Sequence, residues 1–411
     1  MHVLLITWYF PPYQSAGASR LGQLTKYLRL AGHRVSVVTG RPSDLPSLTD
    51  IVTAAEIHYA ANIDLNAVPR SVLGKSSVRE HGYELSRLGR FQWLGRAYKQ
   101  LMHFPDAQVG WIVPALLSAR RIDRPDVVLS SSPAPSAHIA AGLFARSRHI
   151  PWIAEYRDLW TDGPAFRRWW PARPLENGIE AALIRRASIV TTTTKGMAEI
   201  LSARLGRRVE HIPNGFDPED FTGAVTTEPG LFAHTGTVYV TFDTSLLLRA
   251  LPLVRRPIRM VFAGRNLADL PQKVRDRGGT GVDLVGPLER SMAIGLMRRA
   301  EANLLFLWDR KHRLAHVNVT QKLYEYIAAG RPIIVIGHDQ GEAATIVRDS
   351  GLAIFVRTAE ELARALEHVP PLTPDPDVIR RYEYQRLAAR FVDLFDQALR
   401  NGGGGTGTLS K

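Results

Sequence analysis

The 411-residue sequence contains no cysteine. This absence excludes disulfide bonds, a thiolate nucleophile and cysteine-bound metal, and it fits a reducing compartment. Long apolar runs are also missing, because no run approaches the ~18 residues that a membrane-spanning helix needs. The N-terminal run Val3–Phe10 is short, lacks a basic leader and ends in Pro11-Pro12, so it predicts a strand rather than a signal peptide.

Acidic residues are fewer than basic residues, and the formal net charge is +13. Such an excess suits nucleic acid, an anionic membrane surface or phosphorylated substrates. The sequence has no nucleic-acid-binding motif of the usual kinds, so the last two partners lead. The hydrophobic content of 45% is typical of a globular protein. The length predicts two domains or three.

Strand-like apolar runs alternate with helical segments along most of the chain, which predicts an α/β fold with parallel sheets. The expected strands are residues 2–8, 32–39, 126–130, 151–155, 188–192, 231–235, 258–263, 282–285, 302–308, 332–337 and 352–356. Residues 40–78 read as irregular, and residues 79–104 read as helical.

The domain boundary is predicted at the linker His211–Asp217, which Pro213, Asn214 and Gly215 punctuate. The sequence thus divides into an N-terminal Rossmann-like domain (1–212) and a C-terminal Rossmann-like domain (213–375). A C-terminal helix (376–400) is expected to pack back on the N-terminal domain. Residues 401–411, with four consecutive glycines, are expected to be a disordered tail.

The segment His316–Pro332 has the signals of a helix with two marked ends. Asn318 or Thr320 caps its start, Gly330 suits the left-handed residue after the last turn, and Pro332 forbids continuation. The start of such a helix collects unpaired N–H groups and partial positive charge, which attract phosphate.

Two polar side chains of this helix suit a nucleotide. Lys322 adds a full positive charge near the helix start, and Glu325 lies about one turn deeper, where a carboxylate accepts hydrogen bonds from a sugar hydroxyl pair. Leu323 and Ile327, four residues apart, share a buried face. The helix therefore predicts a nucleotide-sugar site. The alternative is an ordinary surface helix with a Lys322–Glu325 ion pair.

Several separated stretches support one family resemblance. They are Tyr9–Pro12 with Gly17, Gly32–Val35, Glu155–Trp160, Ile212–Asp217, Thr235–Tyr239, Ala263–Arg265 and Lys322–Pro332. In these stretches, which cover nearly the whole chain in family order, the sequence resembles family 4 of the retaining glycosyltransferases. That resemblance implies the GT-B fold of two facing Rossmann-like domains. The Arg-Asp-Leu-Trp and Lys-Leu-Tyr-Glu-Tyr pieces look like the subgroup that builds bacterial surface polysaccharides.

The resemblance implies a donor nucleotide held mainly by the second domain and an acceptor held by the first. Glu325 matches the ribose-binding second glutamate of the family's Glu-x7-Glu pattern, whose first position is Val317 here. The diphosphate end of the helix matches Val319, Thr320, Lys322 and Leu323. Gly17 matches the loop glycine that lets backbone approach the diphosphate.

Two positions depart from the family pattern. The Arg and Lys that often follow the first strand of the second domain are missing from Thr237–Leu248, so Arg265 is the substitute candidate for phosphate charge. Arg157 stands where many members have the histidine of a His-Asp pair, followed by Asp158. Arg157 either contacts substrate or pairs with Asp158 or Glu155. Asp158 is either a catalytic or acceptor-orienting carboxylate or a cap.

The resemblance also implies retention of configuration without a divalent metal or a cofactor, with the nucleoside-diphosphate-sugar as substrate. The one Asp-x-Asp, Asp375-Pro-Asp377, lies among prolines and predicts a turn and cap rather than a metal site.

Two basic-aromatic segments, Arg90–Lys99 and Arg167–Arg173, suit the water–lipid interface. A lipid-diphosphate-linked acceptor would explain them, and packing between the domains is the alternative. They predict a cytoplasmic protein, peripheral on the inner face of the membrane.

The sequence thus predicts an enzyme that moves a sugar from a nucleoside diphosphate to a glycan or lipid-linked glycan in polysaccharide or cell-envelope biosynthesis. A natural-product glycosyltransferase, a GT-B sugar-nucleotide epimerase and a non-catalytic GT-B subunit remain alternatives. The departures at Val317 and Arg157 motivate the last of these.

Overall fold

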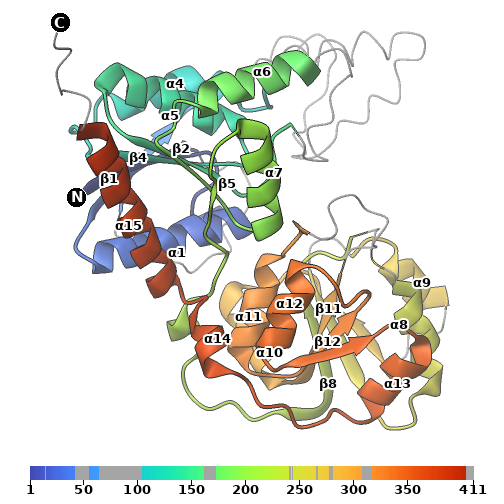
Figure 1. The fold of residues 1–411 in the computed structure, drawn as a ribbon. Coiled ribbons are helices and arrows are strands. Elements are labelled where there is room, and N and C mark those ends of the chain that lie inside the picture. The colour runs from blue at the N-terminus through green and yellow to red at the C-terminus, as the bar shows by residue number, and fades with distance from the viewer. Residues whose placement is uncertain are drawn as a thin grey trace, which may run out of the picture.

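The computed structural model describes residues 1–13, 15–41, 55–63, 104–161, 173–239, 242, 244–264, 267–276, 281–307 and 317–403. These residues form two α/β domains, one stacked on the other, and each is built on a parallel sheet with helices on both faces (Figure 1). The predicted helical stretch 79–104 and the basic-aromatic segment Arg90–Lys99 fall outside the described residues, apart from Phe104.

The N-terminal sheet has seven strands within the described residues, in the order β3-β2-β1-β4-β5-β6-β7. The strands are β1 (His2–Thr7), β2 (Arg34–Gly40), β3 (Glu56–Ala60), β4 (Val127–Ser131), β5 (Trp152–Tyr156), β6 (Ile189–Thr192) and β7 (Glu210–His211). The helices are α1 (Ala16–Leu30), α4 (Ile112–Ala119), α5 (Pro135–Arg148), α6 (Arg173–Ile184) and α7 (Lys195–Leu205).

Strand β3 corrects the prediction that residues 40–78 are irregular throughout. It is an edge strand that pairs in parallel with β2, and only Ala60 of its five residues is buried. An edge strand with so little buried apolar surface lacks the pattern by which a strand is read from sequence.

The core of this domain lies on both faces of the sheet. Along β1, Leu4 and Ile6 join a hydrophobic cluster with α4 and α5, whereas Val3 and Leu5 join a second cluster with α1. A strand covered on both faces needs apolar residues at consecutive positions, which explains the continuous apolar runs of the sequence.

The C-terminal sheet has six strands within the described residues, in the order β10-β9-β8-β11-β12-β13. The strands are β8 (Glu228–Thr235), β9 (Arg259–Ala263), β10 (Val282–Leu284), β11 (Ala300–Phe306), β12 (Ile333–Ile336) and β13 (Ala353–Val356). The helices are α8 (Thr244–Ala250), α9 (Leu270–Asp276), α10 (Arg290–Arg299), α11 (Gln321–Ala329), α12 (Glu342–Asp349) and α13 (Ala359–Glu367).

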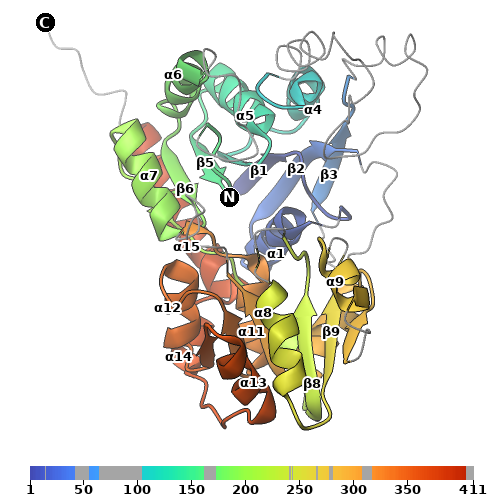
Figure 2. The same cartoon turned by 90° about the vertical axis from the view of Figure 1, so that its right-hand side faces the viewer.

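The chain returns to the N-terminal domain at its end, through α14 (Pro376–Arg380) and α15 (Tyr384–Gly403). Figures 1 and 2 show α15 lying beside α1. Phe391 and Phe395 of α15 are buried in one cluster with Leu21 and Leu24 of α1. The last helix therefore contributes to the core of the first domain.

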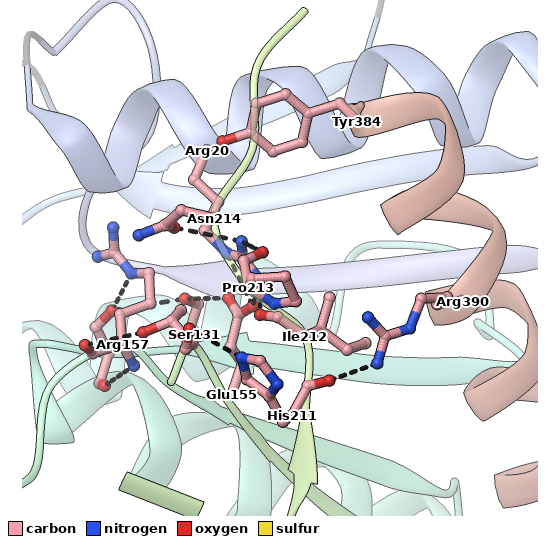
Figure 3. A network of polar contacts seen from close by, with 12 residues as sticks. Arg20, Ser131, Glu155, Arg157, His211, Ile212, Pro213, Asn214, Tyr384 and Arg390 are labelled. Carbon is pink, nitrogen blue, oxygen red and sulfur yellow. Dashed lines mark hydrogen bonds and ion pairs between the residues drawn. The ribbon is translucent and has the colours of Figure 1, made fainter. Parts of the chain in front are cut away.

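The segment between the domains is anchored by the buried Arg20 of α1 (Figure 3). Its guanidinium forms an ion pair with Glu155 at 2.8 Å. It also donates to the backbone carbonyls of Ile212 at 3.0 Å and Pro213 at 2.5 Å, and to Asn214 Oδ1 at 3.2 Å. One buried cation thus ties the linker to the N-terminal sheet. Removal of either Arg20 or Glu155 would leave the other as an unpaired buried charge.

Candidate active site

A cleft of about 970 Å³ lies between the two domains. Its walls include residues that follow strands of both sheets, which is where open parallel sheets bind ligands. The cleft brings together most of the predicted site, namely Gly17, Arg157, Asp158, Val319, Thr320, Lys322 and Glu325. Leu323 is instead buried in the core beneath α11, and Arg265 lies outside the described residues.

Helix α11 begins and ends close to the predicted positions. Thr320 is its N-cap residue, and its side chain makes no capping hydrogen bond to a described residue. Gly330 follows the last turn in the left-handed conformation, with φ 66°. Leu323 and Ile327 are buried as predicted. The first turn of α11 therefore presents its amide groups at the cleft without a side-chain cap.

Glu325 does not pair with Lys322, so the structure contradicts the alternative of a surface helix with a Lys322–Glu325 ion pair. Its Oε1 accepts a hydrogen bond from Arg290 Nη1 at 2.6 Å, and Arg290 Nη2 pairs with Asp220 at 2.7 Å. Although burial opposes charge on Arg290, the two carboxylates raise the pKa of its guanidinium. Arg290 therefore fixes the Glu325 carboxylate at the wall of the cleft while Oε2 stays available to a ligand.

Lys322 is held by the end of strand β8. Its Nζ lies 3.1 Å from His234 Nε2 and 3.3 Å from the carbonyl oxygen of Thr237. His234 Nδ1 lies 2.9 Å from the carbonyl oxygen of Leu304, so Nδ1 carries the proton and Nε2 accepts from the lysine. Burial, together with the neighbouring lysine, lowers the pKa of His234 well below its usual value.

The same burial acts on Lys322. It lowers the pKa of the lysine to about 7, against the opposing attraction of Glu325. Gly236, at φ +94°, lies directly beside the lysine, and a Cβ there would stand 3.1 Å from Nζ. A half-buried ammonium beside uncapped amides is suited to a phosphate, because the anion replaces the hydration that the lysine has lost.

Arg157 extends across the opposite wall, over Gly17. A side chain at Gly17 would overlap the guanidinium, so this packing requires glycine. Arg157 Nε donates to the Ser132 carbonyl oxygen, and Nη2 has no partner among the described residues. Glu155 does not bond to Arg157, because it accepts from Arg20 and Ser131. Burial lowers the pKa of Arg157, which still remains charged at neutral pH.

Asp158 is exposed at the cleft beside Arg157. Loss of hydration within the cleft raises the pKa of Asp158 above its usual value, and the positive charge of Arg157 acts in the opposite direction. Tyr239, from the C-terminal domain, lines the same cleft, and the Asp158 charge contributes to raising its pKa. Asp158 and Tyr239 therefore line one cleft from different domains.

The described residues contain no group of three or more His, Asp or Glu side chains placed to hold a metal ion. Asp375 has the predicted capping role, since its Oδ1 accepts from the backbone N–H groups of Asp377 at 2.9 Å and Val378 at 3.1 Å.

Arg290 and His234 were missed by the sequence prediction. Arg290 is 35 residues from Glu325 and His234 is 88 residues from Lys322. Neither residue has a local signal. Only the parallel sheet, which brings the ends of its strands together, places them in the site.

Solved structures similar to this chain share its GT-B fold of two facing Rossmann-like domains. The sucrose-phosphate synthase of Thermosynechococcus elongatus is 12% identical, with a TM-score of 0.66 over 97% of this chain and 99% of that one. Anabaena HepE, in complex with UDP and glucose, is 14% identical, with a TM-score of 0.62 over 97% and 100%. The lipopolysaccharide outer core galactosyltransferase WaaB is 12% identical, with a TM-score of 0.57 over 97% and 100%.

The sequence itself matches one family model. Residues 17–220, which contain Gly17, Arg157 and Asp158, match Glycosyltransferase Family 4. No curated protein matches the sequence. The family match and the fold together support a glycosyltransferase function.

Proposed function

We propose that the protein transfers a sugar from a nucleoside-diphosphate-sugar to a glycan or lipid-linked glycan, in polysaccharide or cell-envelope biosynthesis. The start of α11 carries this proposal, because its uncapped amides, Lys322 and Glu325 line one wall of the cleft within a single turn. The amides and the ammonium suit a diphosphate, and the carboxylate suits a ribose hydroxyl pair. The HepE structures in complex with UDP and with UDP-glucose support a nucleotide-sugar donor.

The chemistry requires positive charge on the leaving group. As the bond from the sugar carbon to the diphosphate breaks, negative charge grows on the phosphate oxygens, and preorganised donors stabilise it. Lys322 and the amides of α11 supply this charge from one domain, and Arg157 and the start of α1 near Gly17 face it from the other. Arg265 remains a proposed phosphate ligand. Retention of configuration is part of the proposal and follows the resemblance of the sequence.

Asp158 is proposed to act on the acceptor. It is exposed at the N-terminal side of the cleft, opposite the donor helix. Its raised pKa brings the carboxylate closer to the range in which it accepts a proton from a hydroxyl group or orients that group by a hydrogen bond.

The proposed function is tested by titrating a panel of nucleoside diphosphates and then assaying the cognate nucleotide sugars for transfer. We expect one nucleoside diphosphate to bind preferentially and its sugar to be transferred to lipid-diphosphate-linked glycans. Epimerisation of the donor would favour the sugar-nucleotide epimerase, and transfer only to a soluble aglycone would favour the natural-product glycosyltransferase. Binding without turnover would favour the non-catalytic subunit. Failure of every nucleoside diphosphate to bind would contradict the proposal.

Transfer is expected not to need a divalent metal. Lysine, arginine and helix amides provide the positive charge in the cleft, and the described residues contain no metal-binding cluster. Activity should therefore stay within about twofold after exhaustive chelation. Loss of activity on chelation, followed by recovery with magnesium or manganese, would show that this prediction is wrong.

A membrane surface is proposed as a further partner, reached from the cytoplasmic side. Helices α4, α5 and α6 form the outer layer of the N-terminal domain (Figures 1 and 2). They expose the apolar residues Val113, Leu117, Leu143 and Leu175. Beside them lie the exposed arginines Arg120, Arg121, Arg146, Arg148, Arg185 and Arg186. Apolar and cationic groups on one face suit an anionic bilayer.

No helix of the described residues is long and apolar enough to cross a membrane. The segment Arg167–Arg173, proposed from sequence to contribute, lies almost wholly outside the described residues.

Reversing the charge of Arg146 and Arg148 to glutamate should weaken binding to anionic vesicles by tenfold or more at low salt. Each basic residue near such a surface contributes about 1 kcal/mol. Sedimentation with phosphatidylserine vesicles measures the effect, and high salt should release the wild type. The control is the same reversal at the exposed Arg380 and Arg381, at the end of α14. Equal loss in the two variants would show that net charge, rather than this face, drives binding.

A further inference from the structure

Helix α7 of the N-terminal domain is capped from the other domain. Glu342, the first residue of α12, accepts a hydrogen bond at Oε2 from the backbone N–H of Lys195 at 2.7 Å and lies 3.5 Å from the N–H of Gly196. The next amide, that of Met197, is bonded by the Thr194 side chain at 3.2 Å. Since a carboxylate is favourable at a helix start, Glu342 stabilises the contact between the domains.

Val317 makes a second contact with the same helix start. It belongs to the C-terminal half of the chain, yet only 3% of its surface is exposed and it packs within the core of the N-terminal domain. A Cβ at Gly196 would overlap the Val317 side chain, so glycine is required there. Val317 is three residues before Thr320, the N-cap of the donor helix α11. The N-terminal domain therefore contacts the segment that leads into α11, where the diphosphate is proposed to bind.

This contact explains why position 317 departs from the glutamate that the family resemblance implies. The surroundings of Val317 are apolar and include Met197 and Ala198. A carboxylate packed against these apolar side chains would lose hydration, whereas valine gains apolar contact. Val317 also lines the cleft, so position 317 joins the docking of the domains to the wall of the site.

We infer that Val317 and Glu342 are positioning residues, which hold the start of α11 in its working geometry only while α7 is docked. The inference rests on the proposed donor site. Its consequence is that the diphosphate binds to all of its proposed ligands only when the N-terminal domain is docked. Hydrolysis of the nucleotide sugar is thereby limited, because the groups that stabilise the leaving diphosphate are not all in place while the cleft is open to water.

A cycle of two substitutions tests this inference. Gly196→Ala places a methyl group against Val317, and Val317→Ala removes the overlapping group. We expect Gly196→Ala to lower kcat tenfold or more and to weaken nucleoside diphosphate binding several-fold, with bare nucleoside binding unchanged. The double variant should recover most of both losses. Glu342→Ala should act like Gly196→Ala, and Glu342→Gln should be milder because an amide oxygen still accepts from the amides of α7.

Matched controls and an independent readout separate docking from folding and from the proposed function. Gly178 lies in α6, where an added Cβ would meet no other atom, so Gly178→Ala is the control for Gly196→Ala. Glu360 lies in the exposed first turn of α13, so Glu360→Ala is the control for Glu342→Ala. Both should behave like wild type. Small-angle scattering without nucleotide should show a larger radius of gyration for Gly196→Ala and a wild-type value for the double variant. This holds even if no nucleoside diphosphate binds. An unchanged radius in Gly196→Ala and Glu342→Ala, or no recovery in the double variant, would overturn the inference.

Discussion

Replacing Glu325 by alanine should weaken the binding of both a nucleoside and its diphosphate about ten- to a hundredfold. Hydrogen bonds to a charged acceptor contribute about 1.5–3 kcal/mol, which corresponds to this range of dissociation constants. The carboxylate is already fixed by Arg290 at 2.6 Å, so little ordering of the side chain opposes binding. Calorimetric titration of the two ligands measures the effect.

The matched control for this substitution is Glu301→Ala. Glu301 also pairs with an arginine, Arg256 at 2.9 Å, but it lies at the start of β11 and does not line the cleft. Both variants lose an arginine–glutamate pair of the same domain, so both report similar effects on folding. If Glu325→Ala binds both ligands like the wild type while it remains folded, the ribose does not bind at α11.

The second expected result is that the affinity for the nucleoside diphosphate falls as pH rises above about 7. Burial lowers the pKa of Lys322 to about 7, so the free protein holds a charged lysine below this pH and a neutral lysine above it. A diphosphate favours the charged form and raises the pKa in the complex. Linkage then requires affinity to fall by up to tenfold for each pH unit above the free pKa, which approaches about a hundredfold by pH 9.

The groups around Lys322 support the predicted fall in affinity with rising pH. His234 is neutral because burial lowers its pKa, and Glu325 attracts the ammonium without forming a hydrogen bond to it. The bare nucleoside should bind with little pH dependence, since it presents no phosphate to the lysine. Lys322→Arg should flatten the profile, because a guanidinium stays charged at every pH tested. Lys322→Ala should weaken diphosphate binding and leave nucleoside binding nearly unchanged.

The measurement is a titration at several pH values in buffers with different enthalpies of ionisation, which also counts the protons taken up on binding. Below pH 6 protonation of the phosphate itself changes the ligand, so the informative range is above it. Parallel pH profiles for nucleoside and nucleoside diphosphate would contradict the assignment of Lys322 to the phosphate.

Local sequence signals determined most of the fold. Buried parallel strands need uninterrupted apolar residues, so segments such as Val3–Ile6 and Ile333–Ile336 were visible as strands. Helix ends were visible for a similar reason, because Gly330 and Asp375 satisfy backbone groups within a few residues of themselves. The edge strand β3 was missed, since an exposed edge leaves no apolar pattern.

The sequence by itself therefore determined two parallel α/β domains, helix α11 and the residue types that line its first turn. Only the tertiary structure decided how those residues are held. Glu325 is paired with Arg290 rather than Lys322, and Lys322 is held by His234. Val317 is packed against Gly196. The physical reason is that secondary structure follows from neighbours along the chain, whereas burial, charge pairing and pKa depend on partners that only the folded sheets bring together.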